Sequence, residues 1–185
     1  MNKKVILIGG SAGSFQIVLQ LLASLPGNYP HAVILCLHRL KSVKTGFVEA
    51  LSLKSKMPVV EPYDKEAVLP GYIYLSPSNY HLLIEKAEIF SFSTEEPKNH
   101  SRPSIDLALT SASIVFRERL IGVILSGANC DGAEGLAETI KNGGIGLVQD
   151  PKDCQVDTMT GAAIERSQNA FIMNSSQIID YICKI

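Results

Sequence analysis

The residues with the clearest chemical potential in this sequence lie in a glycine-rich turn. Gly9-Gly10-Ser11-Ala12-Gly13 follows the apolar run Val5–Ile8 and has the spacing G-x-S-x-G. This spacing is typical of a nucleophilic serine held on a sharp turn between a strand and a helix. It matches neither the dinucleotide fingerprint G-x-G-x-x-G nor the phosphate loop that ends in Gly-Lys-Ser/Thr, so a nucleotide-binding module is disfavoured. Ser11 is a candidate nucleophile, and a plain strand–helix turn is the alternative.

A candidate base and a candidate acid follow two further apolar runs. His38 comes directly after "HAVILCL", and Asp131 follows "LIGVILSGANC". In an open α/β sheet, ligands bind outside the carboxyl ends of the strands. A hydroxyl, an imidazole and a carboxylate meeting at that edge would have the composition of an acyl-transfer site. The chain order Ser, His, Asp differs from the order Ser, Asp, His of the α/β-hydrolase family, so the turn does not by itself imply that fold.

Each of these residues also has a structural interpretation. Asp131 is well placed to cap the helix that follows it, and His38 can simply satisfy a backbone group at the end of a strand. His31 precedes its strand and belongs to the opposite edge. The remaining rivals are His81 and His100 for the base, Asp150 for the acid, and Cys130, which lacks an activating partner, for the nucleophile.

The elements that must position these residues alternate along the chain. Apolar runs predict strands over Lys4–Ile8, Ala32–Leu37, Leu120–Leu125, Ile145–Val148 and Ala170–Met173. Helices are predicted over Phe15–Ala23, Val43–Lys54, Ile105–Phe116, Ala133–Lys141, Thr160–Glu165 and Gln177–Cys183. The alternation predicts an α/β fold: a doubly wound, mainly parallel twisted sheet with helices on both faces. Residues 1–185 are expected to form a single domain.

The middle of the chain has a different pattern. Short β-prone runs surround Pro70-Gly71 and Pro77-Ser78-Asn79. We expect a hairpin or small antiparallel addition here, and not another βαβ unit. The polar stretch Ser93–Ser101 is expected to be an exposed loop.

Composition excludes several classes of protein. The net charge of −1 gives no general attraction to nucleic acid or to anionic lipid, and no apolar run approaches the roughly 20 residues of a membrane helix. The four cysteines have no C-x-x-C spacing and the histidines are dispersed, so neither a zinc site nor a disulfide framework is indicated, and no cofactor is expected. A cytoplasmic protein without direct membrane insertion is the expectation.

Several motifs in register resemble a known family. "IGGSAGS", "LHR", "LPGYIYLSPSNYH", "RPSIDLALTSA" and "VILSGANCDGAEGL" resemble, in this order, the catalytic domain of the protein-glutamate methylesterases of bacterial chemotaxis (CheB type). The resemblance spans about Val5 to Ile164. It implies a serine esterase that removes methyl groups from receptor glutamates, and also deamidates certain receptor glutamines.

The resemblance also implies roles for individual residues. The family triad falls on Ser11, His38 and Asp131, and the backbone N–H groups near Ala12 and Ala128 are placed to stabilise the oxyanion. The resemblance places "SRPSID" near the substrate groove, so Arg102 is a candidate for orienting the substrate, and a solvated turn residue is the alternative. The implied partner is the cytoplasmic helical region of chemoreceptors, and the basic residues Arg39, Lys41 and Lys44 are candidates for steering that docking. A non-catalytic binding or regulatory protein on the same fold is the alternative.

The sequence departs from the family pattern at three points. The usual Ser-Thr-Gly-Gly of the turn is Ser11-Ala12-Gly13-Ser14, the usual Gln-His-Met is Leu37-His38-Arg39, and the usual Gly-Met-Gly is Gly127-Ala128-Asn129. Family members also carry a receiver domain ahead of the catalytic domain, whereas Met1 lies just before the first predicted strand. The expectation is an unregulated enzyme, control by a separate regulatory partner, or a chain that is part of a longer polypeptide.

Overall fold

A seven-stranded sheet forms the centre of the protein in our computed structural model, which describes residues 3–38 and 46–185. The strand order is β3-β4-β2-β1-β7-β8-β9, and every described pairing in this sheet is parallel. The strands are β1 (Val5–Gly10), β2 (Ala32–Leu37), β3 (Val59–Val60), β4 (Ile73–Leu75), β7 (Leu120–Ile124), β8 (Ile145–Gln149) and β9 (Phe171–Met173).

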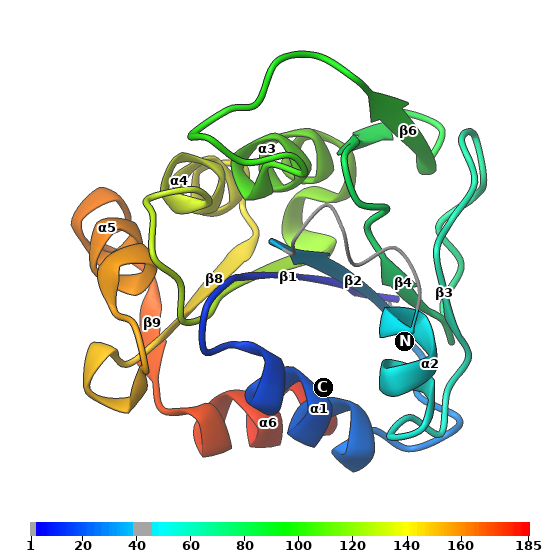
Figure 1. The fold of residues 1–185 in the computed structure, drawn as a ribbon, viewed down its shortest axis with the longest axis horizontal. Helices are drawn as coiled ribbons and strands as arrows, with labels where there is room; N and C mark the ends of the chain where they lie inside the picture. Colours follow the sequence, from blue (N-terminus) through cyan, green and yellow to red (C-terminus); the bar gives the residue numbers. More distant parts are fainter. Residues whose placement is uncertain (1–2, 39–45) are drawn as a thin grey trace.

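Helices cover both faces of this sheet (Figure 1). The helices are α1 (Phe15–Ser24), α2 (Phe47–Ser52), α3 (Ile105–Phe116), α4 (Ala133–Lys141), α5 (Thr158–Arg166) and α6 (Ser175–Lys184), with short 3₁₀ turns η1 (Arg117–Arg119) and η2 (Pro151–Asp153). In Figure 1, α1 and α6 lie on one side of the sheet, and α3 and α4 lie on the other. None of the helices in the described residues combines the length and the apolar character that a membrane crossing requires.

The core has two halves because neighbouring strand residues point to opposite faces. Along β1, Val5 and Leu7 pack in the half beneath α3 and α4, whereas Ile6 and Ile8 pack in the half that faces α1 and α6. All six residues of β1 and of β2 are buried. Strands buried on both faces read as continuous apolar runs, which is why the sequence identifies them so clearly.

The predicted fold class is confirmed, with one correction in the middle of the chain. β5 (His81–Glu85) and β6 (Ile89–Ser93) form the expected antiparallel hairpin, which packs against α3. Ile73–Leu75, however, is not part of an antiparallel addition: it pairs in parallel with β2 inside the main sheet. β3, the edge strand beyond it, was not predicted. Of the helix expected over Val43–Lys54, the described part is Phe47–Ser52, and residues 43–45 lie outside the described residues, as do Arg39, Lys41 and Lys44.

Candidate functional site

The direction of chain winding reverses between β1 and β7. In the strand order, β2 and β4 are added on one side of β1, and β7, β8 and β9 are added later on its other side. At such a switch point the loops diverge and leave a crevice at the carboxyl edge. Ser11, His38 and Asp131 all follow these central strands, β1, β2 and β7. The three sequence candidates therefore lie at the same edge.

His38 and Asp131 are in direct contact. The Nε2 atom of His38 lies 2.8 Å from Oδ2 of Asp131, and the side chains are 13% and 0% exposed. The backbone N–H of His38 donates to the Gly10 carbonyl at 3.0 Å, which fixes the end of β2 beside the turn of Ser11. The position of His38 is thus set by the sheet, and one ring nitrogen is committed to the buried carboxylate.

Asp131 receives hydrogen bonds from the N-terminus of α3. Oδ1 accepts from the Ser104 hydroxyl (2.9 Å) and the Asp106 N–H (3.1 Å), and Oδ2 accepts from the Ile105 N–H (2.7 Å). Burial alone would raise the pKa of the Asp131 carboxyl, but the hydrogen bonds from His38, Ile105 and Asp106 hold its pKa below its ordinary value. The carboxylate is consequently ionised at neutral pH, as an acid that supports an imidazolium must be.

The capping interpretation of Asp131 needs a correction. The N-cap position of α4, the helix after Asp131, is occupied by Gly132, with no side-chain cap. The N–H groups of Gly132 and Gly135 instead donate to Oδ1 of Asp106, each at 2.9 Å, and Asp106 belongs to α3. The N-terminus of α3 therefore receives the carboxylate of Asp131, from the loop before α4, and the N-terminus of α4 receives the carboxylate of Asp106, from α3. A buried carboxylate at a helix N-terminus satisfies orphan N–H groups and complements the helix dipole.

Ser11 is held in a turn that is fixed by its backbone. Its N–H donates to the Ser126 carbonyl at 2.9 Å, and its own carbonyl accepts from the Ser14 hydroxyl at 2.8 Å. Gly13 follows with φ of +86°, and a Cβ on it would lie 2.7 Å from the Ser126 hydroxyl. Within the described residues the Ser11 hydroxyl makes no hydrogen bond. The structure brings Ser11 to the edge of the site but does not join its hydroxyl to His38.

The loops that carry Ala12 and Ala128 are tied together by Ser126. The Ser126 hydroxyl lies 2.7 Å from the Ala12 carbonyl and accepts from the Val156 N–H at 3.0 Å. Both alanines are exposed. Their loops follow the neighbouring strands β1 and β7, so the two backbones lie at the same carboxyl edge of the sheet.

The rival candidates lie in other surroundings. Burial lowers the pKa of His31, whose Nδ1 accepts from the Lys4 N–H at the opposite edge. His81 is buried between the Glu96 carbonyl and the Ser104 N–H. His100 and Cys130 are exposed, and Asp150 caps η2 through the Lys152 N–H. None of these residues contacts the His38–Asp131 pair through a hydrogen bond in the described part of the chain.

Arg102 is engaged with the protein itself. Its guanidinium donates to Oδ1 of Asn79 and to the carbonyls of Thr94 and Glu95 at 2.6–3.3 Å. These bonds anchor the loop between β6 and α3. The residues that sequence reasoning missed, Ser101, Ser104 and Asp106, all belong to this loop or to the start of α3. The signal for two of them was present, since Ser104 precedes an apolar helix with an acid in its first turn.

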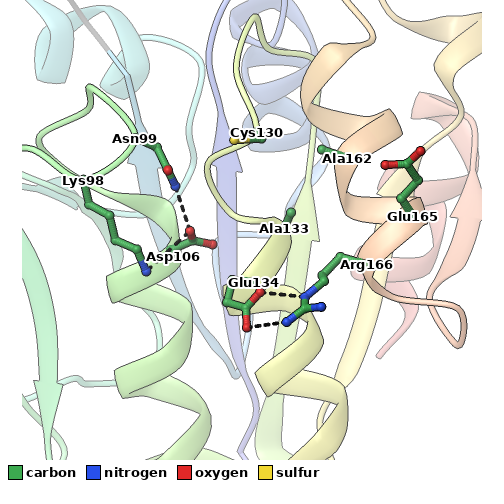
Figure 2. A pocket seen from close by; sticks show the side chains of 9 residues that line it. All are labelled: Lys98, Asn99, Asp106, Cys130, Ala133, Glu134, Ala162, Glu165 and Arg166. Atoms are coloured by element: carbon green, nitrogen blue, oxygen red, sulfur yellow. Dashed lines mark hydrogen bonds and ion pairs between the residues drawn. The ribbon is translucent and has the colours of Figure 1, made fainter.

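A hollow of about 520 Å³ lies between the start of α3, α4 and α5 (Figure 2). Its rim carries the ion pair of Arg166 and Glu134, and Lys98 reaches Asp106 at 3.6 Å. Cys130, next to Asp131 in the chain, also lines it. Among the described residues, no group of three or more His, Cys, Asp or Glu side chains is arranged to hold a metal ion.

Comparison with known proteins identifies the family. A family model described as CheB methylesterase matches residues 6–182. A curated relative from Leptospira interrogans is 37% identical over 185 residues, which are 100% of this chain and 96% of the relative. A Chromohalobacter salexigens protein named protein-glutamate methylesterase/protein-glutamine glutaminase is 35% identical over 166 residues, 88% of this chain and 47% of that protein.

A solved structure agrees with the fold. The crystal structure of the Thermotoga maritima CheB methylesterase catalytic domain superposes with a TM-score of 0.92 at 26% identity, covering 100% of this chain and 99% of that one. The sequence match, the matching fold and the acid–imidazole pair at the switch point are mutually consistent. The chain belongs to the CheB methylesterase family.

Proposed function

We propose that this chain is a protein-glutamate methylesterase: a serine hydrolase that removes methyl groups from glutamate methyl esters of chemoreceptors and also deamidates receptor glutamines. The observation that carries the proposal is the 2.8 Å contact between His38 Nε2 and the buried Asp131 carboxylate, at the same sheet edge as Ser11. The names of the relatives, which are methylesterases and glutaminases, support the same substrates. A non-catalytic binding protein is not favoured, because such a role would not require a buried acid–imidazole pair.

In this proposal, each ring nitrogen of His38 has its own role. Because Nε2 is committed to Asp131, Nδ1 is the atom that takes the proton of the Ser11 hydroxyl as Oγ attacks the ester carbonyl carbon. The tetrahedral oxyanion then collapses, and the departing methoxide receives the Nδ1 proton and leaves as methanol. Water attacks the acyl-enzyme, again giving a proton to Nδ1, and the carboxylate product and the free Ser11 hydroxyl result.

The surroundings of the triad complete the proposal. Backbone N–H groups near Ala12 and Ala128 stabilise the oxyanion, a role that depends on the turn and not on the side chain. Arg102 contributes to substrate binding, by shaping the loop that borders the site. No cofactor takes part. Residues 1–185 act as one catalytic domain in the cytoplasm, where the receptor's methylated helices lie.

The test is methanol release from methylated receptor membranes. Wild type should release methanol, and Ser11→Ala should lose several orders of magnitude in kcat, because the members of a triad act as a unit. A fluorophosphonate probe should label wild type but not Ser11→Ala. Ser24→Ala is the matched control, since Ser24 is exposed at the end of α1 and bonds only the Gln20 carbonyl. Labelling that persists in Ser11→Ala would refute the assignment of the nucleophile.

A further inference from the structure

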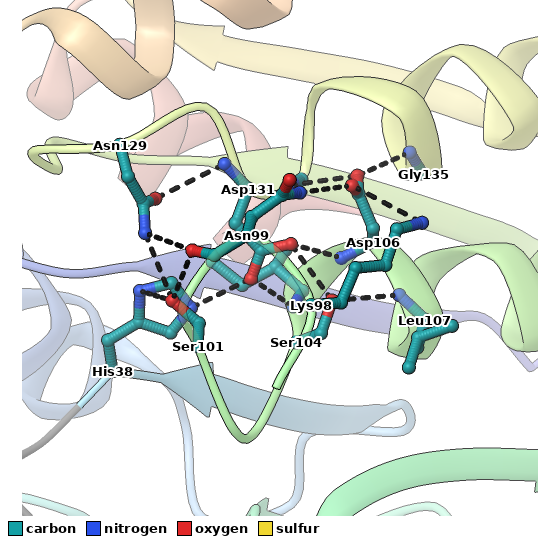
Figure 3. A network of polar contacts seen from close by, with 12 residues as sticks. His38, Lys98, Asn99, Ser101, Ser104, Asp106, Leu107, Asn129, Asp131 and Gly135 are labelled. Carbon is teal, nitrogen blue, oxygen red and sulfur yellow. Dashed lines mark hydrogen bonds and ion pairs between the residues drawn. The ribbon is translucent and has the colours of Figure 1, made fainter. Parts of the chain in front are cut away.

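The second ring nitrogen of His38 faces a serine that is not the proposed nucleophile. The Ser101 hydroxyl lies 3.3 Å from Nδ1 of His38. Figure 3 shows Ser101 beside the imidazole ring, with Asn129 above the two in this view. Ser101 is only 8% exposed. The nitrogen that must act as the base therefore has a buried hydroxyl as its neighbour.

Asn129 connects this serine to Asp131. Its Nδ2 donates to the Ser101 hydroxyl at 3.0 Å and lies 3.3 Å from the Asn99 carbonyl, while its Oδ1 accepts from the Asp131 N–H at 3.2 Å. The contact to the Asp131 N–H fixes which end of the Asn129 amide is oxygen.

The hydrogens of this network can be placed in one consistent order. The Asp131 carboxylate can only accept, so Nε2 of His38 carries a hydrogen and Nδ1 of the neutral ring is an acceptor. The Asn129 amide nitrogen can only donate, so the Ser101 oxygen accepts from it and directs its own hydrogen to Nδ1. Every donor then has an acceptor.

The same network also fits the protonated ring. When Nδ1 carries a hydrogen, it donates to the Ser101 oxygen, and the hydroxyl hydrogen turns to the Asn99 carbonyl, 3.3 Å away. A hydroxyl can make this exchange because its hydrogen rotates freely. Ser101 can therefore hold the ring in both protonation states, whenever neither the Ser11 hydroxyl nor the leaving group is engaged with Nδ1.

The backbone before Ser101 is shaped to deliver it. Asn99 and His100 both have left-handed backbone conformations, with φ of 50° and 61°. Such conformations are uncommon for residues other than glycine and cost about 1–3 kcal/mol each. The Ser101 N–H donates to the Lys98 carbonyl at 2.9 Å, which closes the turn. The turn aims the hydroxyl at the imidazole.

We propose that Ser101 and Asn129 are positioning residues for His38: Ser101 holds Nδ1 of the ring, and Asn129 holds Ser101. This inference rests on the proposed role of His38 as the base. Neither residue is proposed to exchange a proton or to contact the substrate: Ser101 acts only through Nδ1 of His38, and Asn129 only through Ser101 and Asp131. Their contribution is to keep the imidazole plane aligned between Asp131 and the nucleophile, which a single bond through Nε2 leaves free to turn.

The test compares Ser101→Ala and Asn129→Ala with a matched control. Ser113 provides the control, because its buried hydroxyl accepts from Nδ2 of Asn142 at 3.0 Å and donates to the Thr110 carbonyl, far from His38. Ser113→Ala thus removes a similar serine–asparagine contact outside the site. Folding of each variant is checked by circular dichroism before the measurements.

Two measurements are made on each variant. In ¹⁵N spectra of the histidine rings, with the His38 signals identified by their absence in His38→Gln, the Nδ1 resonance of neutral His38 should move toward that of a nitrogen without a hydrogen bond in Ser101→Ala and Asn129→Ala. Kinetics of methanol release should show kcat lowered about 3- to 10-fold with KM unchanged, the loss expected of one neutral hydrogen bond. Ser113→Ala should change neither.

The outcomes separate this inference from the proposed function. An Nδ1 resonance that stays at its wild-type position in Ser101→Ala would overturn the inference, as would a loss of kcat that Ser113→Ala shares in full. Wild-type protein that releases no methanol would instead refute the proposed function. The ring spectra would still decide whether Ser101 contacts His38, because they require no activity.

Discussion

Replacing Asp131 by asparagine tests the proposed acid most sharply, because the change keeps the size of the side chain and removes its charge. The carboxylate accepts from His38 Nε2 and Ile105 N–H on one oxygen, and from Ser104 Oγ and Asp106 N–H on the other. An asparagine has one oxygen and one NH₂ group in their place. Whichever way the amide is turned, its NH₂ faces a backbone N–H.

Stability should fall in either orientation. With the NH₂ on the Ser104 side, the hydroxyl can rotate to accept, but the Asp106 N–H is orphaned; with the NH₂ on the other side, the Ile105 N–H is orphaned. A buried donor without a partner costs about 1–3 kcal/mol, and the lost charge at the N-terminus of α3 adds about 0.3–2 kcal/mol. We expect the free energy of unfolding to fall by about 2–4 kcal/mol.

Activity should fall much further than stability explains. An amide at this position carries no charge to stabilise an imidazolium, and with its NH₂ group toward Nε2 it also imposes the wrong imidazole tautomer. In a serine-protease triad the equivalent change costs about 10⁴-fold in kcat. The assay is methanol release under conditions where urea unfolding shows the variant to be folded. Asp150→Asn is the control, because Asp150 caps η2 through one N–H and asparagine caps nearly as well. An Asp131→Asn variant with the kcat of Asp150→Asn would refute the reasoning.

Four further predictions follow from described contacts. Because hydrogen bonds lower the pKa of Asp131 in the folded state, its contribution to stability should be complete above the unfolded pKa of about 3.9 and be lost as the pH falls through the lower folded pKa. Urea unfolding from pH 7 to pH 2 should show this loss of stability at low pH in wild type and a smaller loss in Asp131→Asn. Gly13→Ala should lower the free energy of unfolding by about 1–3 kcal/mol and reduce kcat, since φ is +86° and the new Cβ would meet Ser126 and Gln155 at 2.7 Å; a fully stable and active variant would contradict this. Arg102→Ala should raise KM with little change in kcat, because the guanidinium anchors the loop that borders the site, and unchanged KM would remove it from substrate binding. Treatment with a metal chelator should leave methanol release unchanged, and loss of activity that zinc restores would argue against a serine mechanism.

The sheet and the place of the site could be predicted from the sequence because both depend on local signals. Doubly buried strands such as β1 and β2 are unbroken apolar runs, and the polar residue after each run marks the carboxyl edge. β4 could not be placed in this way. It has three residues next to Pro70-Gly71, and its pairing with β2 depends on a tertiary contact that no local pattern encodes.

The surroundings of the candidate site were harder to predict for the same reason. Asp131 looked like the cap of its own helix, because an acid before a helix usually is. The exchange of caps between α3 and α4 joins residues 25–29 positions apart and becomes visible only when the two helices pack side by side. Ser101 likewise reaches His38 across 63 positions. The sequence shows which side chains can take part, but not which partners they meet.

The exchange of carboxylates between α3 and α4 has a consequence for how this region opens. The amide hydrogens of Ile105 and Asp106 are held by Asp131, and those of Gly132 and Gly135 are held by Asp106. Neither helix can fray at its first turn without releasing the carboxylate that protects the other. In hydrogen–deuterium exchange these four amides should therefore open together, as one cooperative unit with one opening free energy, although they lie at the N-termini of two different helices. The acid proposed for catalysis thus also couples the local unfolding of α3 to that of α4.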